Sequence, residues 1–565
     1  MKKFTADFET CTWLDNETYV WAWASCEIGN EENLQINNSI ESFIDYCISL
    51  DNPIFYFHNL KFDGEFLIWW ALKNGFKHVQ KKEEIEDMTF TTLISDMGQF
   101  YNIVFYFKKG NKKVKKATFI DSLKIIPFSV SDTAKYFKLP ISKLELDYNE
   151  KRELGHILTD HEREYITNDV VIMAKALKVI FDEGLTKQTR ASNALDDFKK
   201  ILGTKSKFEH YFPKLEFELD KELRKSYKGG FTYLNPIYAE KNIENVNVLD
   251  VNSLYPSVMY SKKLPIGNPI FFEGKYENDK VYDLYIQTFS CSFELKKGKI
   301  PTIQLKGRKG FFAENEYLTS SNNEIVSMTL TSVDLKLFLE QYNVYDLEYE
   351  KGWKFRSIDT IFQKYIDKWI AKKIEAGKNG NAGQRQLAKL QLNSLYGKLA
   401  TSLETQSKIP YLGDDEIVHY TLSEKEEKEG IYLPAGAFIT AYAREKTIRT
   451  SQAIMDYSIK KYGKDLYVYS DTDSIHTMLS IEELKQFCEI DDFKLGYWAY
   501  EAHATKARFV RQKTYIEEID GKMKITCAGL PSRCYDKVTW ENFKIGFTCS
   551  GKLTFKHVKR WRKIS

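Results

Sequence analysis

Two aspartates, Asp471 and Asp473, interrupt an apolar segment and restrict the possible architectures more than any other motif in this chain. The segment DLYVYSDTDSIHTM, residues 465–478, predicts a strand, a tight turn and a second strand. Side chains two residues apart on an extended backbone point to the same face, so the two carboxylates would lie together. Like charges at that distance repel each other unless a cation neutralises them. For this motif alone, an ordinary aspartate-rich turn is an equally good interpretation.

A further aspartate ends a strand-like segment much earlier in the chain. In NVLDVNSLYPSVM, residues 247–259, an apolar run leads to Asp250 and then turns toward a helix. Asp250 and Asp473 could hold two Mg²⁺ ions roughly 3.5–4 Å apart, with the backbone carbonyl of Val251 as an additional ligand. Paired ions at that spacing are typical of phosphoryl transfer. The sequence therefore predicts that these distant segments meet.

The segment RQLAKLQLNSLYGKL, residues 385–399, predicts a helix with one polar stripe. At about 100° per residue, Arg385, Lys389, Asn393 and Tyr396 fall within an arc of about 80°. Leucines occupy the rest of the circumference, so the helix would be buried on most sides. Two cations, an amide and an aromatic ring on one stripe suit a nucleoside triphosphate; the alternative is a solvated face with Tyr396 in the core.

Acidic residues also recur at three places in the N-terminal third. Asp7 and Glu9 share one strand face in FTADFET, and Asp63 follows in FHNLKFDGEF. Tyr165 and Asp169 are four residues apart in EYITNDVVIM, which makes them neighbours on a helix. Each motif alone is weak, because an aspartate on a helix is usually a surface residue.

Taken together, these motifs resemble family B DNA polymerases. DVNSLYPS, KLQLNSLYG and YSDTDS are similar to the three palm and fingers motifs, in that family's order. KSYKGG and RQKTY are similar to its motifs for the template and for the primer end. The arrangement is most similar to the protein-primed subgroup of Bacillus phages, and it spans nearly the whole chain. The resemblance implies a DNA-directed DNA polymerase that replicates a phage genome and carries a 3′–5′ exonuclease.

The resemblance also implies roles for the matching polymerase residues. Asp250 and Asp473 would be catalytic metal ligands with Asp471 in support, and Tyr255 would stack under the incoming sugar and exclude a ribose. Arg385 and Lys389 would bind the triphosphate, while Asn393 and Tyr396 would check the nascent pair. Contacts to template and primer would come from Tyr227, Gly229, Gly230, Lys513 and Tyr515, with Thr440 and Arg444 of FITAYAR as a further primer–template motif.

For the exonuclease, the resemblance implies two metal ions among Asp7, Glu9, Asp63 and Asp169, with Tyr165 orienting the attacking water. The frayed primer strand would be held by Thr10, His58, Asn59, Phe62, Ser122 and Leu123. Lys143 is placed as an auxiliary catalytic lysine. Glu145 stands as a metal ligand where an aspartate is more usual in the family.

A chain of 565 residues is too long for one core and should divide into domains. The expected fold is a multidomain α/β and α+β protein: a ribonuclease-H-like exonuclease and a right-hand polymerase with two insertions. The expected boundaries are exonuclease 1–187, first palm part 188–261, first insertion 262–358, fingers 359–400, second insertion 401–433, second palm part 434–530 and thumb 531–565. A hairpin is expected within residues 537–555.

By analogy with the subgroup, the first insertion would contact a terminal priming protein or the duplex. The second would support strand displacement and processivity. The expected partners are primer–template DNA, dNTPs and a terminal protein, the expected cofactor is Mg²⁺ with Mn²⁺ as a substitute (two ions per site), and the expected state is a monomer. The alternative interpretation is that both insertions merely cover the surface.

Composition adds limits but no function. The net charge is +3, so only the basic runs 108–116 and 556–563 could follow a phosphate backbone, and such runs are more often solvated surface. The eight cysteines show no metal-ligand spacing, which favours a reduced intracellular protein. No signal core or membrane span is expected, so we expect a cytoplasmic protein, in the host cytoplasm if viral.

Two other functions remain possible from the sequence. The chain could be a catalytically inactive nucleic-acid-binding relative whose acidic motifs are structural. It could also be an exonuclease with an accessory DNA-binding domain. Both are disfavoured because each of the two carboxylate sets is complete, and clustered carboxylates cost stability when nothing neutralises them.

Overall fold

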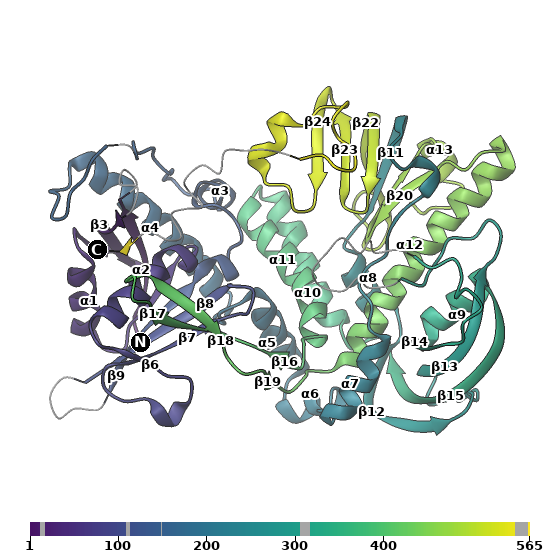
Figure 1. Cartoon of the computed structure of the whole chain (residues 1–565), viewed down its shortest axis with the longest axis horizontal. Coiled ribbons are helices and arrows are strands. Elements are labelled where there is room, and N and C mark those ends of the chain that lie inside the picture. The colour runs from purple at the N-terminus through teal and green to yellow at the C-terminus, as the bar shows by residue number, and fades with distance from the viewer. Residues whose placement is uncertain (12–16, 109–113, 149, 305–316, 549–562, 565) are drawn as a thin grey trace.

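The computed structural model describes residues 1–11, 17–108, 114–148, 150–304, 317–548 and 563–564. The chain forms two parts that lie side by side (Figure 1). The N-terminal half runs to the end of the helix Asp160–Asp182, and the C-terminal half contains the sheet that begins with the strand Thr232–Leu234. Most of the basic runs 108–116 and 556–563, and most of the predicted thumb after residue 548, lie outside the described residues.

An eight-stranded sheet forms the centre of the N-terminal half. Its strand order is β4-β3-β1-β5-β9-β8-β7-β6, with β1 antiparallel to β3 and parallel to β5. The strands are β1 (Lys3–Thr10), β3 (Val20–Glu27), β4 (Asn30–Asn37), β5 (Ile54–Phe57), β6 (Lys77–His78), β7 (Thr89–Ile94), β8 (Phe100–Phe107) and β9 (Lys115–Asp121). The helices are α1 (Ile40–Ser49), α2 (Leu60–Lys73), α3 (Val130–Tyr136) and α4 (Asp160–Asp182). The predicted α/β domain is thus confirmed.

Aromatic packing fixes this sheet. Phe43 of α1 contacts the rings of Phe8, Phe55 and Phe57, all of them buried. Each ring of this size buries roughly 150–250 Å², so the cluster supplies much of the stability of this half. It also holds β1, which bears Asp7 and Glu9, in a fixed place.

The C-terminal half is built on a seven-stranded sheet of order β10-β20-β21-β11-β22-β23-β24. In it, Asp250 is paired with Ser474, so the two predicted acidic segments meet. Its strands are β10 (Thr232–Leu234), β11 (Asn242–Val251), β20 (Tyr467–Asp471), β21 (Ser474–Thr477), β22 (Trp498–Arg511), β23 (Thr514–Ile519) and β24 (Lys522–Cys527).

The first predicted insertion is a separate four-stranded sheet, of order β12-β15-β13-β14, at the right edge of Figure 1. It contains β12 (Leu264–Glu273), β13 (Leu284–Leu295), β14 (Val326–Thr331), α9 (Ser332–Gln341) and β15 (Tyr342–Ile358). All of these elements lie within residues 262–358, the range expected for the first insertion.

Helices fill the space between the sheets. α5 (Arg190–Leu202), α6 (Lys205–Tyr211) and α7 (Phe217–Leu223) connect the two halves, and α8 (Leu254–Ser261) follows β11. α10 (Gln363–Lys378) and α11 (Ala382–Leu399) lie within the range 359–400 expected for the fingers. α12 (Leu433–Tyr462) packs against β20 and β21 of the seven-stranded sheet, which lies in the expected palm and is called the palm sheet below. α13 (Ile481–Leu484) is a single turn.

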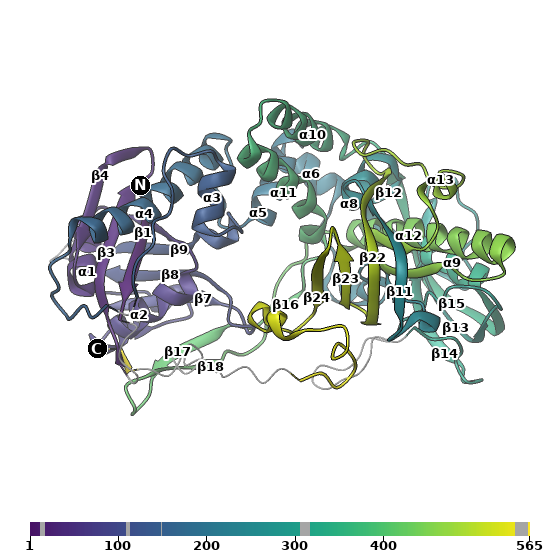
Figure 2. The same cartoon turned by 90° about the horizontal axis from the view of Figure 1, so that it is seen from above.

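The second predicted insertion bridges the halves. Its strands are β16 (Glu404–Thr405), β17 (Lys408–Leu412), β18 (Val418–Leu422) and β19 (Glu426–Glu427). The β17–β18 hairpin lies along α2 and β7 (Figure 2). The hydroxyl of Tyr420 donates to Oε2 of Glu65 at 2.7 Å, and the amide of Asp96 donates to the carbonyl of Gln406 at 3.0 Å.

The C-terminal region departs from the expectation. Residues 538–548 form turns and loops instead of the first strand of a hairpin, and the rest of the predicted hairpin lies outside the described residues. Val538 and Phe543 are buried in a cluster with Val510 and Ile516, and this packing takes precedence over the local β pattern. The final short strand, β25 (Lys563–Ile564), pairs with β2 (Glu17–Thr18) of the N-terminal half.

The seven cysteines of the described segments are all free thiols. Six of them are buried, and Cys527 at the end of β24 is partly exposed. Within the same segments no helix combines the length and the apolar character that a membrane crossing needs.

Candidate active sites

In the C-terminal half, Asp250 and Asp473 lie together at the end of the palm sheet. The amide of Val251 donates to the carbonyl of Asp473 at 2.8 Å, which ties the end of β11 to the acidic turn. Burial, followed by the charges of Asp473 and Glu501, raises the pKa of Asp250 to about 7. Burial and the neighbouring carboxylates also raise the pKa of Asp473. These two groups are the ones that a cation would stabilise most.

Asp471 differs from its two neighbours because the chain itself neutralises it. Nζ of Lys513 donates to both carboxylate oxygens, at 2.7 and 2.9 Å, and the hydroxyl of Thr232 donates to one of them at 3.0 Å. The predicted primer residue Lys513 is therefore held on a predicted catalytic carboxylate. This arrangement fits a supporting role for Asp471 better than the role of a direct metal ligand, because both of its oxygens already accept hydrogen bonds.

The turn between Asp471 and Asp473 is braced from two sides. Thr472 has a positive φ of 59°; its amide donates to the carbonyl of Phe231 at 2.6 Å, and its carbonyl accepts from the hydroxyl of Thr447 at 2.7 Å. A Cβ on Gly230 would lie 2.5 Å from Oγ1 of Thr472. Glycine is therefore needed at position 230 because any side chain there would clash with Thr472 in the acidic turn. The sequence alone did not indicate this reason.

Helix α11 presents the predicted polar stripe. Arg385, Lys389 and Asn393 are exposed, and Tyr396 is half-buried, while the leucines face inward. The charge of Lys389 lowers the pKa values of both Asp250 and Asp473, so the stripe faces the acidic centre.

Two further charged residues, Glu501 and Lys373, lie near this centre and were not predicted from the sequence. Glu501 of β22 acts on both Asp250 and Asp473, although a single acid in an alternating strand has no local signature. Burial and the charges of Arg385 and Lys389 lower the pKa of Lys373 on α10. Lys373 is therefore a third cation close to the polar stripe of α11, although it lies on the preceding helix α10.

Tyr255 and Tyr396 form a stacked pair above the acidic centre. Their ring centroids are 3.9 Å apart, with an interplanar angle of 23°. Burial, followed by the contact with Tyr396, raises the pKa of Tyr255 far above its ordinary value, so the phenol stays neutral. The two rings predicted to contact the incoming nucleotide lie next to each other.

The predicted template and primer residues divide into two groups. Tyr227 and Gly229 border the palm, and a Cβ on Gly229 would meet nothing within 4 Å. Arg444 and Thr440 are buried, so the direct DNA contact predicted for them does not fit their position. Arg444 instead pairs with Asp334 of the first insertion and donates to the carbonyls of Lys228 and Gly229 at 2.6 and 2.7 Å, and so supports the template motif from within.

Tyr515 lies on β23, two residues after Lys513. Its ring contacts Tyr469, His476 and Phe509. This aromatic cluster fixes the predicted primer residue against the back of the acidic hairpin.

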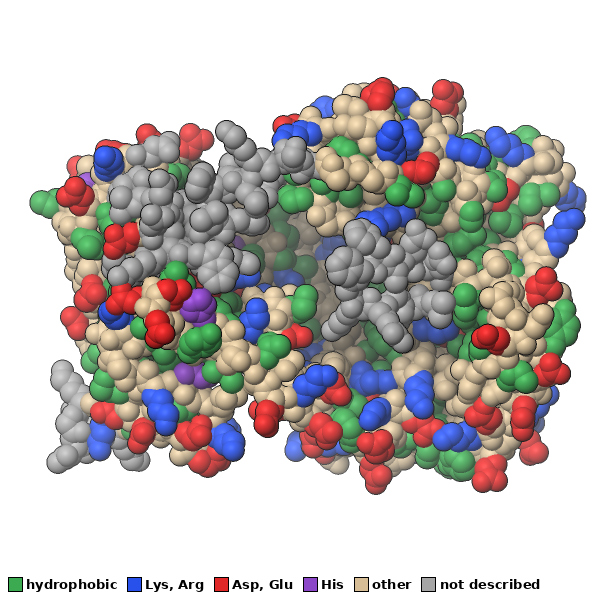
Figure 3. Space-filling model, viewed as in Figure 1, with side chains coloured by type: hydrophobic (Ala, Val, Ile, Leu, Met, Phe, Trp, Pro, Cys, Tyr) green, Lys and Arg blue, Asp and Glu red, His purple; other side chains and the backbone are tan. Residues whose placement is uncertain are grey.

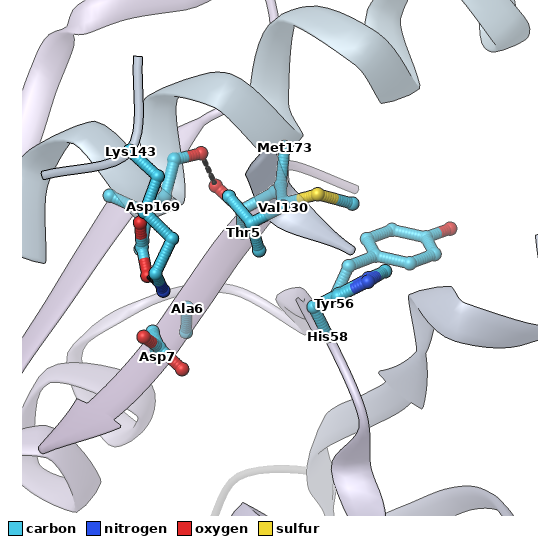
Figure 4. A pocket seen from close by; sticks show the side chains of 10 residues that line it. Thr5, Ala6, Asp7, Tyr56, His58, Val130, Lys143, Asp169 and Met173 are labelled. Carbon is cyan, nitrogen blue, oxygen red and sulfur yellow. Dashed lines mark hydrogen bonds and ion pairs between the residues drawn. The ribbon is translucent and has the colours of Figure 1, made fainter. Parts of the chain in front are cut away.

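In the N-terminal half, the four predicted carboxylates converge from β1, α2 and α4. The amide of Phe8 donates to Oδ1 of Asp63 at 3.2 Å, which joins β1 to α2. Asp7 and Asp169 line one pocket, with Lys143 between them (Figure 4). Residues far apart in the sequence are thus brought to one place, as the motifs predict.

Electrostatic repulsion pervades this acidic cluster. Burial, followed by the charge of Asp169, raises the pKa of Asp7 to about 7. The pKa values of Glu9 and Asp63 are raised well above the ordinary range, first by burial and then by Asp7. Burial also raises the pKa of Asp169, although Lys143 opposes the shift. The cluster would therefore gain from an additional cation.

Lys143 and Tyr165 both lie near Asp169. Lys143 donates to Oδ2 of Asp169, and the hydroxyl of Tyr165 shares a hydrogen bond of 2.6 Å with that of Tyr148. Tyr148 was not among the predicted residues. Glu145 is exposed, and its backbone carbonyl lies 3.1 Å from Nε2 of His161, so a ligand role for its side chain does not fit this position.

The predicted single-strand residues lie beside the carboxylates. Nδ1 of His58 is 3.1 Å from the hydroxyl of Ser122, and its Nε2 is 2.7 Å from the carbonyl of Phe128. The amides of Asn59 and Leu123 donate to Asp121 at 3.2 and 3.0 Å. Phe62 is 50% exposed and free to stack, whereas Thr10 is buried.

The donors at both centres suit hard divalent cations, which prefer carboxylate and carbonyl oxygens. Oδ1 of Asp169 is buried without a hydrogen-bond partner, and the raised pKa values report unneutralised charge. Even so, no three acidic, histidine or cysteine side chains among the described residues are arranged closely enough to enclose an ion. The residues therefore fit divalent ions, with side-chain adjustment as the ions enter.

Figure 3 shows a depression between the two halves of the molecule with Lys and Arg side chains near it. Basic groups at such a depression attract phosphate backbones.

Comparison with known proteins identifies the family. The family model for organellar and viral type B DNA polymerases matches residues 44–485. The DNA polymerase of Bacillus phage Nf is 45% identical over 571 residues, covering 98% of this chain and 96% of the relative. That of Bacillus phage phi29 is 43% identical over 568 residues, covering 97% and 95%.

The structure agrees with that relationship. Phi29 DNA polymerase, solved as a complex with primer-template DNA and incoming nucleotide substrates, superposes with a TM-score of 0.89 at 41% identity, covering 97% of this chain and 95% of the other. The chain belongs to the organellar and viral type B DNA polymerases.

Proposed function

We propose that this DNA polymerase extends a primer at the Asp250–Asp473 centre and excises mispaired 3′ ends at the Asp7–Asp169 centre. The observation that carries the proposal is the convergence of two separate carboxylate clusters, each from remote segments and each with raised pKa values. Strongly perturbed carboxylates in depressions are typical of catalytic sites. The phi29 structure with primer-template DNA and nucleotides supports DNA and dNTPs as ligands.

At the polymerase centre, Asp250, Asp473 and the carbonyl of Val251 would hold Mg²⁺, for which Mn²⁺ can substitute. The two ions, when bound, supply activation of the primer hydroxyl and neutralise charge on the phosphates. Arg385 and Lys389, with Lys373 beside them, bind the triphosphate oxygens. Asn393 and Tyr396 border the nascent base pair.

Template and primer are positioned by different residues. Gly229 lets a phosphate approach the backbone closely, and Tyr227 and Gly230 complete that loop. Lys513 and Tyr515 hold the primer end at the acidic turn. Arg444 and Thr440 act from the interior, through the backbone of the template loop.

At the exonuclease centre, Asp7, Glu9, Asp63 and Asp169 would hold the divalent ions. Tyr165 orients the attacking water, and the ammonium of Lys143 offsets the developing negative charge. The single-stranded end is held by Phe62, His58, Asn59 and Leu123, while Ser122 and Thr10, which are buried, support this surface from within. Glu145 is not part of this proposal because its side chain is exposed.

We further propose that the enzyme is a monomer of the host cytoplasm, primed by a terminal protein, processive and strand-displacing. The two insertions support this, since β17–β18 closes one side of the molecule against the N-terminal half. Residues 262–358 would face the priming protein or duplex, and residues 531–565 would form the thumb.

Rolling-circle synthesis on a primed single-stranded circle tests these properties in one reaction. The chain alone, with dNTPs and Mg²⁺, should give products much longer than the circle. Products that stop at one circle length would refute displacement, and short products that grow only with added enzyme would refute processivity. Replacement of primer by a terminal protein tests protein priming separately.

Replacing Tyr255 by Val should raise ribonucleotide incorporation by about 10- to 100-fold relative to deoxynucleotides. The reason is that the ring would lie where the 2′-hydroxyl must pass, and one steric contact of this kind is worth about 1–3 kcal/mol. Single-nucleotide addition with rATP and dATP measures the ratio. Tyr255→Phe keeps the ring and should keep the selectivity; an unchanged ratio in Tyr255→Val would remove the assigned role.

A further inference from the structure

Between α3 and α4 the chain crosses the exonuclease centre as a strap, residues 138–159. Its described residues, 138–148 and 150–159, form neither helix nor strand. The strap nevertheless carries Lys143, which contacts Asp169, and Tyr148, which contacts Tyr165. Two groups of the active site therefore depend on a segment with no backbone ladder of its own.

The first part of the strap is fixed to α4 by side chains of that helix. Asn168 donates its amide to the carbonyl of Ser142 at 3.1 Å, and His161 lies 3.1 Å from the carbonyl of Glu145. Both contacts precede Tyr148, and another anchor is needed on its other side.

Arg152 provides that anchor. Its side chain is only 2% exposed. One guanidinium nitrogen, Nη1, donates to the carbonyl of Asp147 at 2.8 Å and to that of Glu150 at 3.2 Å. These two carbonyls flank Tyr148, so a single group fixes the backbone on both sides of the tyrosine.

The rest of the guanidinium is tied to the body of the domain. Nε donates to Glu162 on α4, and the planar group lies 4.9 Å from the centre of the Trp21 ring on β3. Burial alone would raise the pKa of Glu162, but hydrogen bonds from Arg152, Thr159 and His156 bring it down to about 2. The partner of Arg152 is thus an ionised carboxylate, and the buried pair is fully hydrogen-bonded.

Only arginine offers this set of contacts. A guanidinium has five donors in a rigid plane and stacks on an aromatic face, whereas a lysine has one rotatable ammonium and cannot reach the strap, α4 and Trp21 together. The hydrogen bonds of the guanidinium within the described residues go to the strap and to Glu162, and not to the four carboxylates of the catalytic cluster. Its charge lowers the pKa of Glu9, and a lysine at this position would keep that charge while losing the contacts with the strap.

We propose that Arg152 is a positioning residue for 3′-end excision, because it fixes the strap so that Tyr148 meets Tyr165 and Lys143 meets Asp169. This inference rests on the exonuclease activity proposed above. It predicts that a change far from the carboxylates lowers the rate of the chemical step and leaves nucleotide addition intact.

The test uses the full-length protein and single-turnover excision from a single-stranded oligonucleotide at saturating enzyme. Arg152→Lys should lower the rate about 10- to 100-fold, the usual effect of removing a group that orients a catalytic one. Glu162→Gln, which keeps the shape of the partner, should act in the same direction. Arg163→Lys, at an exposed position on the same helix, should stay within twofold of wild type.

A general loss of structure is distinguished by two further measurements. Nucleotide addition on a primed template, by the same preparations, should be unchanged. In a background that carries both Lys143→Ala and Tyr148→Phe, Arg152→Lys should cost less than threefold, because both groups that the strap positions are then absent and residues that act through one unit are not additive. An equal loss in both backgrounds, a parallel loss of nucleotide addition, or excision within twofold of wild type would each overturn the proposal. Absence of excision by the wild-type chain would overturn the exonuclease itself, and this inference with it.

Discussion

Asp250→Ala and Asp473→Ala should each abolish nucleotide addition and leave 3′-end excision at the wild-type rate. The two carboxylates lie at the end of one sheet, and burial and the charges of neighbouring carboxylates raise their pKa values, so they are the groups that a divalent ion would stabilise most. Loss of the ions should remove several kcal/mol of transition-state stabilisation, and about 4 kcal/mol corresponds to roughly a thousandfold in rate.

The measurement is single-nucleotide addition to a primed template, beside excision from a single strand, with the same preparations. Glu244→Ala is the matched control, since Glu244 is an exposed acid on the same strand β11; it should leave both rates unchanged. Asp250→Asn should behave like Asp250→Ala, because the amide keeps the shape and loses the charge. If addition and excision fell together, the two-centre interpretation would be wrong.

The combined change Asp7→Ala and Asp63→Ala should have the converse result. Excision should fall by at least about a thousandfold, by the same argument from several kcal/mol of lost stabilisation, while addition persists. Both side chains lie inside the N-terminal half, on β1 and α2, and neither belongs to the palm sheet. The double change removes charge from a cluster that repels itself, so the fold should not be weakened.

Excision of a mismatched 3′ end, followed in the same tube by extension, gives both rates. Asp45→Ala, at an exposed position on α1, is the control and should leave excision intact. The double variant should also extend mismatched ends without trimming them. Continued excision at more than a tenth of the wild-type rate would place the nuclease elsewhere.

The parts of the fold that the sequence predicts well are those with a local signature. The acidic hairpin follows from alternation on both sides of a turn, and the stripe on α11 follows from helical spacing. The pairing of Asp250 with Ser474 could not be predicted from local pattern alone. It was predicted because both segments place a carboxylate at a strand end and because the motifs occur in the family's order.

Other features depend on contacts that no local pattern records. Glu501 joins the acidic centre only because β22 pairs with β11. Arg444 is buried because Asp334, from the first insertion, lies beside it, whereas its motif alone suggested a surface contact. The predicted C-terminal hairpin was wrong over residues 538–548, since Val538 and Phe543 gain more by burial against the palm than by strand pairing.

The distribution of thiols makes it possible to label the β17–β18 hairpin with a dye and to measure its motion. Six of the seven described cysteines are buried, and Cys527 is partly exposed. Once Cys527 and Cys549 are changed to serine, a cysteine engineered at the tip of the β17–β18 hairpin would accept a fluorophore selectively. A second dye on α2 would then report, by energy transfer, how often the hairpin leaves the N-terminal half with and without primer-template DNA.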